Sequence, residues 1–299
     1  MRNELTDEAI EYGSVVSRAI EGAGGDALAG AAEADPSRRR ELVWPVLAEL
    51  GAWDLDPLGD PDEAEAAAAL CRAVGRWAVP YPVAARLSRL STVEAEGAFV
   101  VTGPRPAAPL EGLAGRWAAV DLDGDVALVR GRPSGRPPRK TAFVAAVDLE
   151  PLGVGVSATE VALAVALPCW TLLGMLDRAL EMTRAYVLDR QQFGQQLSRF
   201  QSVQFQLTDA EVERVGVEEL VKYSLWSIEA RRPEVVYRVC HQLHGAIGFC
   251  DETPLSWLSR YSQPLRRLPT SPAATRAVLA ERVAVEGLVG IYTPEEARR

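Results

Sequence analysis

The sequence predicts a mainly α-helical protein in which a small β domain separates an N-terminal helical domain from a C-terminal antiparallel helical bundle. Alanine-rich helical runs precede about residue 90, short alternating apolar and polar segments follow, and long helical patterns return from about residue 158. With 299 residues and 48% hydrophobic content, the chain can bury a substantial core. We therefore predict three domains, at 1–92, 93–157 and 158–299.

Helix start and stop signals organise the N-terminal domain. The segment 35–37, Asp-Pro-Ser, is a start signal ahead of the run RRRELVWPVLAEL, and Gly51 follows that run as a C-terminal cap would. Residues 62–79 predict another helix, because alanine has the highest helix propensity and the acidic residues are grouped at the start. Two nearby prolines then end it.

The middle segment is typical of a small antiparallel sheet. AFVVTG, RWAAVDLDGDVALVRG and TAFVAAVDL alternate apolar and polar residues and are divided by Gly, Pro and Asp. Asp123-Gly124, between WAAVDL and DVALV, is a strong signal for a β-hairpin.

The C-terminal part predicts a bundle, since long helices with short connections favour antiparallel neighbours. The most hydrophobic window, VALAVALPCWTLLGML at 161–176, contains a proline and is shorter than the roughly 20 residues that a membrane-spanning helix needs. We therefore expect a buried core helix and no membrane partner. The predicted helices lie near 160–189, 198–230, 233–245, 253–262 and 272–288.

Charge and cysteine content narrow the function classes. Acidic residues outnumber basic ones, 41 to 32, and the net charge of -9 argues against a nucleic-acid partner. The four cysteines show no Cys-x-x-Cys spacing and have apolar neighbours, as reduced core thiols of a cytoplasmic protein do. The N-terminal segment MRNELTDEAIEYG has no apolar core, so we expect no secretory signal there.

A glutamine-rich connector between two predicted helices is the first candidate site. It places Arg190, several glutamines, Phe193 and Gly194 on a short non-periodic segment. A planar guanidinium with neighbouring amides suits a phosphate or diphosphate, because it offers paired N–H donors. From the residues alone, a solvated polar connection between helices remains the competing interpretation.

Two ordered motifs relate the chain to a known family. RQQFGQQLSRFQSVQFQLTD resembles the arginine-x-glutamine-phenylalanine-glycine segment and following Phe-Gln helix of acyl-CoA dehydrogenases. Downstream, CHQLHGAIGFCDETPLSWLSRY resembles that family's Gln-x-x-Gly-Gly-x-Gly turn and the next helix. The resemblance is strong over about 170–262 and loose before that, and it implies the helix, sheet, helix architecture of a short and divergent member.

The resemblance implies an FAD cofactor held at a subunit interface. Arg190 would contact the FAD diphosphate, with Gln192 and Phe193 beside it and Gln201 at the start of the next helix. From the second motif, Gln242 and Gly245 would approach the adenosine-diphosphate half. There the second glycine of the family's pair is replaced by Ala246, which adds one methyl group near the cofactor.

The catalytic base is the point at which this sequence departs from the family. These enzymes remove the α-proton of an acyl thioester with a carboxylate of raised pKa in a dry pocket. The stretch that corresponds to the family's glutamate loop, 265–276, contains no acid, and neither does VALAVALPCW on the first bundle helix, where other members carry the base. The family's Asp-x-x-Arg signature for CoA is also missing. Asp251 and Glu252 are the remaining candidates for the base.

Two histidines near the second motif do not indicate a metal site. His241 and His244 are three residues apart and have no matched Cys or carboxylate spacing, so structural roles are favoured over a metal or a general base.

Three functional hypotheses remain open at this point. The first is a flavin-dependent acyl-CoA or acyl-carrier dehydrogenase that forms a homo-oligomer, or a heteromer in which a longer acyl-CoA dehydrogenase subunit supplies the glutamate. The second is a catalytically inactive subunit with a structural, non-redox role. The third is an enzyme of the same fold recruited to different chemistry.

Overall fold

The computed structural model describes residues 4–101, 106–131 and 143–229. The predicted helices after residue 230, the second motif and two of the four cysteines lie outside the described residues. The three predicted domain boundaries remain a prediction.

The N-terminal helices begin and end where the sequence provides capping groups. The Thr6 side chain accepts a hydrogen bond from the Ala9 N–H, and the Asp60 side chain caps the helix that starts at Pro61. Asp35 caps a single 3₁₀ turn, and Gly51, at φ +68°, follows the next helix as predicted. The elements are α1 (Asp7–Gly22), α2 (Ala27–Ala34), η1 (Pro36–Arg38), α3 (Arg39–Ala48), α4 (Pro61–Arg76) and α5 (Val83–Leu87).

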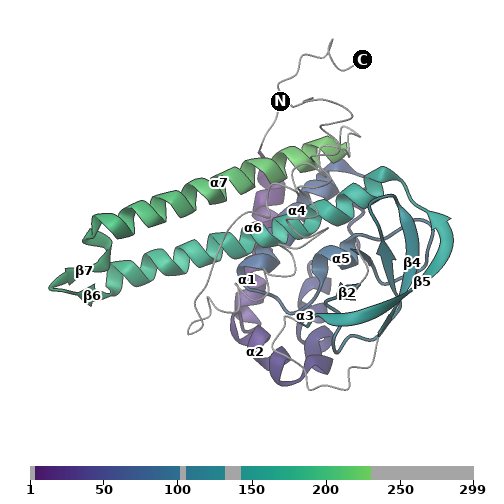
Figure 1. Ribbon diagram of the computed structural model, residues 1–299, viewed down its shortest axis with the longest axis horizontal. Helices are drawn as coiled ribbons and strands as arrows, with labels where there is room; N and C mark the ends of the chain where they lie inside the picture. Colours follow the sequence, from purple (N-terminus) through teal and green to yellow (C-terminus); the bar gives the residue numbers. More distant parts are fainter. Residues whose placement is uncertain (1–3, 102–105, 132–142, 230–299) are drawn as a thin grey trace, which may run out of the picture.

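The sheet, which lies at the right of Figure 1, has five strands. Their order is β1-β3-β4-β5-β2. The Asp123-Gly124 hairpin is confirmed, because β3 and β4 flank it in antiparallel register and Gly124 has φ +91°. The prediction of a purely antiparallel sheet is wrong at one pairing, since β1 and β3 are parallel. The chain leaves β1, forms β2 at the opposite edge and returns, which allows the parallel alignment. The strands are β1 (Ala98–Val100), β2 (Ala107–Ala108), β3 (Trp117–Val120), β4 (Asp125–Gly131) and β5 (Ala145–Gly155).

A buried arginine joins the helical part to the sheet. Arg39, 2% exposed, donates hydrogen bonds to the backbone oxygens of Pro80, Pro109 and Glu111 at 2.7, 3.0 and 2.6 Å. Its guanidinium also lies 4.1 Å from the centre of the Phe143 ring. A buried charge is tolerated only when it is hydrogen-bonded in this way, so Arg39 fixes α3 against the segments that flank the sheet.

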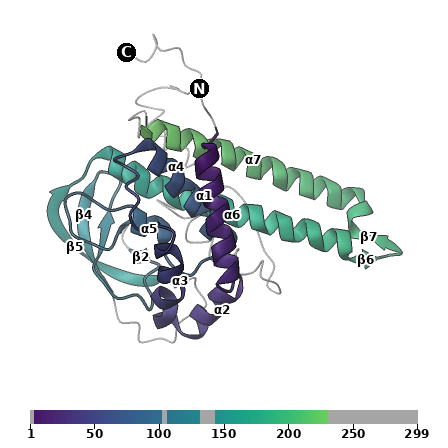
Figure 2. The same cartoon turned by 180° about the vertical axis from the view of Figure 1, so that it is seen from behind.

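Two long helices run through the body and extend beyond it. They are α6 (Ala158–Asp189) and α7 (Gln201–Glu229), close to the predicted 160–189 and 198–230. Ser157 and Glu160 form a capping box at the start of α6. Figures 1 and 2 both show the far ends of α6 and α7 projecting together from the body. We call this projection, residues 178–213, the arm.

Helix α6 is the centre of the core, as the apolar window predicts. Of the described helices, α6 alone is long and apolar enough to cross a membrane, and 78% of its most apolar window is buried inside the protein. Trp170 and the leucines at 163, 167 and 173 are at most 1% exposed. This helix therefore meets the expectation of a buried core helix.

Helices α4 and α6 approach each other backbone to backbone. A Cβ atom at Gly75 would overlap the Thr171 carbonyl oxygen, and one at Gly174 would overlap the Arg72 carbonyl oxygen. Glycine at both crossing points permits this distance. The crossing brings the side chains that flank it, Arg72 on α4 and Asp177 on α6, within bonding distance.

Candidate functional site

The connector folds into a small β-hairpin at the tip of the arm (Figure 1). The sequence predicted a non-periodic segment, whereas Gln191–Gln192 pairs with Gln195–Gln196 in antiparallel register. The Leu197 N–H donates to the Arg190 oxygen at 2.9 Å and closes the base of the hairpin. Phe193 and Gly194 have φ values of +54° and +81°, as in the two-residue turns that suit a hairpin.

Phe193 is an exposed aromatic residue in a strained backbone position. Its side chain is 89% exposed, and its ring meets Phe200 edge to face with centroids 6.2 Å apart. A bulky residue at positive φ is a genuine outlier, and Asn or Gly would fit this turn better. The hairpin therefore presents a large apolar ring at a cost in backbone energy.

Arg190 is the cation of this tip. It caps the end of α6, its backbone N–H donates to the Tyr186 oxygen at 2.8 Å, and the residue is exposed. No carboxylate among the described residues lies within ion-pair distance of its guanidinium. The exposed Gln192 lies next to it on β6, and Gln201, also exposed, begins α7. The tip thus joins a cation, amide donors and an aromatic ring.

The predicted residues of the second motif, Gln242, Gly245, Asp251 and Glu252, lie outside the described residues. Their association with the tip is a prediction.

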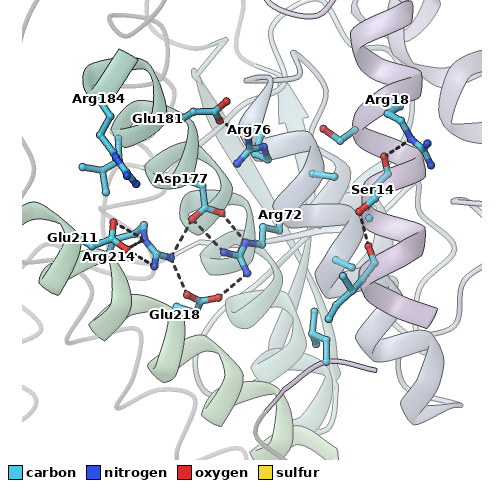
Figure 3. Close-up of a pocket in the computed structure, with 17 residues that line it drawn as sticks. Ser14, Arg18, Arg72, Arg76, Asp177, Glu181, Arg184, Glu211, Arg214 and Glu218 are labelled. Atoms are coloured by element: carbon cyan, nitrogen blue, oxygen red, sulfur yellow. Dashed lines mark hydrogen bonds and ion pairs between the residues drawn. The ribbon is translucent and has the colours of Figure 1, made fainter. Parts of the chain in front are cut away.

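A groove of about 990 Å³ lies between α1, α4, α6 and α7. Figure 3 shows arginine and carboxylate side chains from α4, α6 and α7 along one side of it, facing α1. The sequence alone did not indicate this groove. Its charged lining residues are Arg18, Arg72, Arg76, Asp177, Glu181, Arg184, Glu211, Arg214 and Glu218.

Four of these side chains close a ring of ion pairs, which we call the ion ring. Arg72 bonds Asp177 at 2.7 Å and Glu218 at 2.8 Å, and Arg214 bonds the same two carboxylates at 3.2 and 2.8 Å. Every member therefore has two oppositely charged partners within the ring. Outside it, Arg214 also bonds Glu211, and Glu218 also pairs with Lys222. The four side chains are only 10–29% exposed, so the pairs are screened less than surface pairs are. The ring joins three helices.

The ion ring favours the charged forms of Arg72, Arg214 and Glu218. Burial alone would raise the pKa of Glu218, but the hydrogen bond from Arg214 and the charge of Arg72 outweigh burial and lower it. The hydrogen bonds that Arg214 donates to Glu211 and Glu218 raise the pKa of Arg214. The hydrogen bond that Arg72 donates to Asp177 raises the pKa of Arg72 against the effect of burial. Because its cations are already neutralised, the ring offers no free phosphate site.

No described carboxylate has the raised pKa that a catalytic base requires, among those with a resolved shift. Glu160 is the buried example. Burial would raise its pKa, but N–H groups of Ser91 and Ser157 and the Ser157 hydroxyl all donate to it, and together they lower the pKa. Glu160 is thus committed to capping α6.

The sequence contained part of the signal for the ion ring. Glu211, Arg214 and Glu218 follow the three- and four-residue spacing of helical ion pairs. The partners from α4 and α6 depend on the glycine crossing, which spacing along one helix does not indicate.

Comparison with known proteins shows that part of this chain is similar in sequence to acyl-CoA dehydrogenases. The sequence model of the acyl-CoA dehydrogenase C-terminal domain matches residues 153–283. The probable acyl-CoA dehydrogenase YngJ of Bacillus subtilis is 31% identical over 96 residues, covering 27% of this chain and 25% of that protein. The acyl-CoA dehydrogenase FadE28 of Mycobacterium tuberculosis is 26% identical over 126 residues, covering 36% of this chain and 37% of that protein. The matches thus span well under half of either relative.

Solved structures match the fold over nearly the whole chain. A variant of the steroid ACAD Tcur3481-Tcur3483 has a TM-score of 0.66 and 19% identity, covering 96% of this chain and 100% of its own. The ChsE4-ChsE5 complex from Mycobacterium tuberculosis has a TM-score of 0.65 and 17% sequence identity. The match covers 98% of this chain and 100% of the matched chain. An acyl-CoA dehydrogenase complexed with FAD from Bacillus anthracis has a TM-score of 0.61 and 14% sequence identity. The match covers 96% of this chain and 69% of that one.

Proposed function

We propose that this chain, whose residues 153–283 match the acyl-CoA dehydrogenase C-terminal domain and whose fold matches solved structures of that fold, takes part in the flavin-dependent α,β-desaturation of an acyl thioester. The substrate would be carried on CoA or on an acyl-carrier protein. The chain would act as one subunit of an oligomer, in which the tip of one arm serves the cofactor of its neighbour.

The strained, exposed Phe193 carries this proposal. Backbone strain persists where the surroundings or the function require it. Here the side chain stays exposed despite its edge contact with Phe200, so burial within the described chain does not explain the strain. Contact of the Phe193 ring with the surface of another subunit would explain both the exposure of the ring and the backbone conformation of the residue. The remaining large exposed apolar side chains of the arm, Tyr186, Leu188, Phe205 and Val212, support the same idea.

The residues of the tip fit the diphosphate of FAD, the ligand named for the Bacillus anthracis relative. Arg190 would give two parallel N–H donors to phosphate oxygens, while Gln192 and Gln201 would add neutral donors. Gly194, where a Cβ would meet nothing within 4 Å, leaves open space at the turn of the hairpin. Gln242 and Gly245 would complete the site.

When bound, the flavin would accept the hydride from the β-carbon of the acyl group. The α-proton must leave to a base, and the described carboxylates with a resolved shift all have lowered pKa values. We therefore assign the base either to Asp251 or Glu252, or to a glutamate of a longer partner subunit. A heteromer is supported by the ChsE4-ChsE5 relative, which is itself a complex.

The proposal is tested by expressing the chain alone and together with acyl-CoA dehydrogenase subunits encoded beside it, and by recording the visible spectrum and the FAD content of each preparation. Flavin bound in the complex, with thioester-dependent bleaching, is the expected result. A colourless complex that takes up no added FAD would exclude the dehydrogenase function. Turnover that persists in Glu252→Gln and Asp251→Asn would assign the base to the partner.

A further inference from the structure

The ion ring stands at the base of the arm. Asp177 lies thirteen residues before Arg190 on α6, and Arg214 lies thirteen residues after Gln201 on α7. At 1.5 Å per residue, the ring is about 20 Å from the tip along both helices. Figure 3 shows α4 contributing Arg72 at the same level, so the base is tied to the body of the protein.

Beyond the ring the arm has almost no core. Of the described residues between 178 and 213, Val187 is the one that is buried, and residues such as Arg184, Tyr186 and Phe205 are exposed. Without an apolar interior, packing alone sets the angle of the arm weakly. A tilt of about 5° at the base would move the tip by roughly 2 Å, more than a hydrogen bond to a phosphate tolerates.

The chemistry of the ring suits an angular constraint. Each guanidinium is a rigid planar fork, and Arg72 uses Nε and Nη2 on Asp177 and Nη1 on Glu218. Arg214 repeats this arrangement between Glu211, Asp177 and Glu218. Such directional bonds to α4, α6 and α7 restrict the rotation of the two arm helices against the body more than apolar contacts would.

We propose that Arg72, Asp177, Arg214 and Glu218 are positioning residues that set the direction of the arm and so the place where its tip presents Arg190. This role rests on the proposed function of the tip, but the direction of the arm can be measured independently of FAD.

The direct test is a distance distribution between spin labels at Gln191, on the tip, and Glu49, after α3. Labels attached to a ketone-bearing unnatural amino acid leave the native cysteines unchanged. We expect one narrow distribution for the otherwise unchanged chain and a broadened or displaced one for Asp177→Asn. Arg72→Lys, which keeps the charge but loses the fork, should fall between them. Glu213→Gln, next to Arg214 on α7, is the matched control and should change nothing, because Glu213 is exposed and no ion pair among the described residues joins it to the body.

A folded Asp177→Asn protein with an unchanged distribution would overturn the proposal. If that variant does not fold, Glu218→Gln opens the ring at one corner and decides the question in the same way.

The second readout is FAD affinity of the assembled oligomer. We expect at least about a tenfold weaker affinity in Asp177→Asn, since small misplacements of a binding group are costly. An altered distance with unchanged FAD affinity would refute the link to the cofactor. If the unsubstituted complex binds no FAD, the proposed function fails, whereas the distances still decide whether the ring sets the arm.

Discussion

Arg72 Nε lies 2.7 Å from Asp177 Oδ2, and this bond joins α4 to α6 across 105 residues of sequence. The contact depends on the glycine crossing beside it, because Gly75 and Gly174 allow the two backbones to approach. It also begins the ion ring that includes α7. The predictions below concern the ring, the crossing and the tip.

Asp177→Asn should lower the free energy of unfolding by about 2–4 kcal/mol, because each of two largely buried guanidinium groups loses one of its carboxylate partners. Urea denaturation followed by circular dichroism measures this change. Glu181→Gln removes an exposed pair on the same helix and should change the free energy by less than about 1 kcal/mol. Equal effects of the two substitutions would mean that the ring is not a stabilising unit.

The lowered pKa of Glu218 predicts that the folded protein loses stability in acid. Since its pKa is lowered in the folded protein, its contribution is fully present above its ordinary value of 4.5 and is lost as the pH falls through the folded pKa. The stability difference between the unsubstituted chain and Glu218→Gln should therefore shrink between about pH 5 and about pH 3. Urea titrations at several pH values provide the measurement. A difference that stays constant over this interval would show that Glu218 does not titrate as the ring requires.

Gly75→Ala and Gly174→Ala should each destabilise the protein by about 3 kcal/mol or more, because the added methyl overlaps a backbone oxygen of the facing helix. Gly216→Ala is the matched control within α7, where a Cβ would meet nothing within 4 Å. It should stabilise by about 0.5–1 kcal/mol, since alanine has the higher helix propensity. The midpoints of urea unfolding show which variants are destabilised and which is stabilised. A Gly75→Ala protein as stable as the unsubstituted chain would contradict the close crossing.

Phe193→Asn separates the turn from the proposed contact. Asparagine tolerates positive φ, so the hairpin should be retained or stabilised, while the exposed ring is lost. We expect unchanged or higher thermal stability of the isolated chain together with weaker assembly, measured by analytical ultracentrifugation, and with less bound FAD. Assembly and FAD content equal to those of the unsubstituted chain would leave the strained phenylalanine without the proposed role.

Patterns within single segments predicted most of the described fold. The apolar window of α6, the helix signals around Asp35 and Gly51 and the Asp123-Gly124 hairpin act locally, and the structure agrees with them. The predicted helix, sheet, helix class of an acyl-CoA dehydrogenase fold is likewise confirmed.

Features that depend on distant segments could not be predicted. The parallel β1–β3 pair depends on a crossover through β2, and the ion ring depends on a glycine crossing between α4 and α6. The connector was predicted to be irregular because a phenylalanine at positive φ is a poor signal for a two-residue turn. For the site, the sequence indicated the tip residues but not the groove beside the ring.

The central claim is that Arg190 holds a cofactor diphosphate, and the FAD dissociation constant of the assembled protein tests it most directly. Arg190→Ala should weaken binding about tenfold to a hundredfold, because a charge-assisted hydrogen bond contributes about 1.5–3 kcal/mol. Arg199 is an exposed arginine of the same connector, and Arg199→Ala removes the same charge. It should change the FAD dissociation constant by at most about twofold, which is a change in binding free energy of less than about 0.5 kcal/mol. Equal FAD affinity in the two variants would contradict the claim.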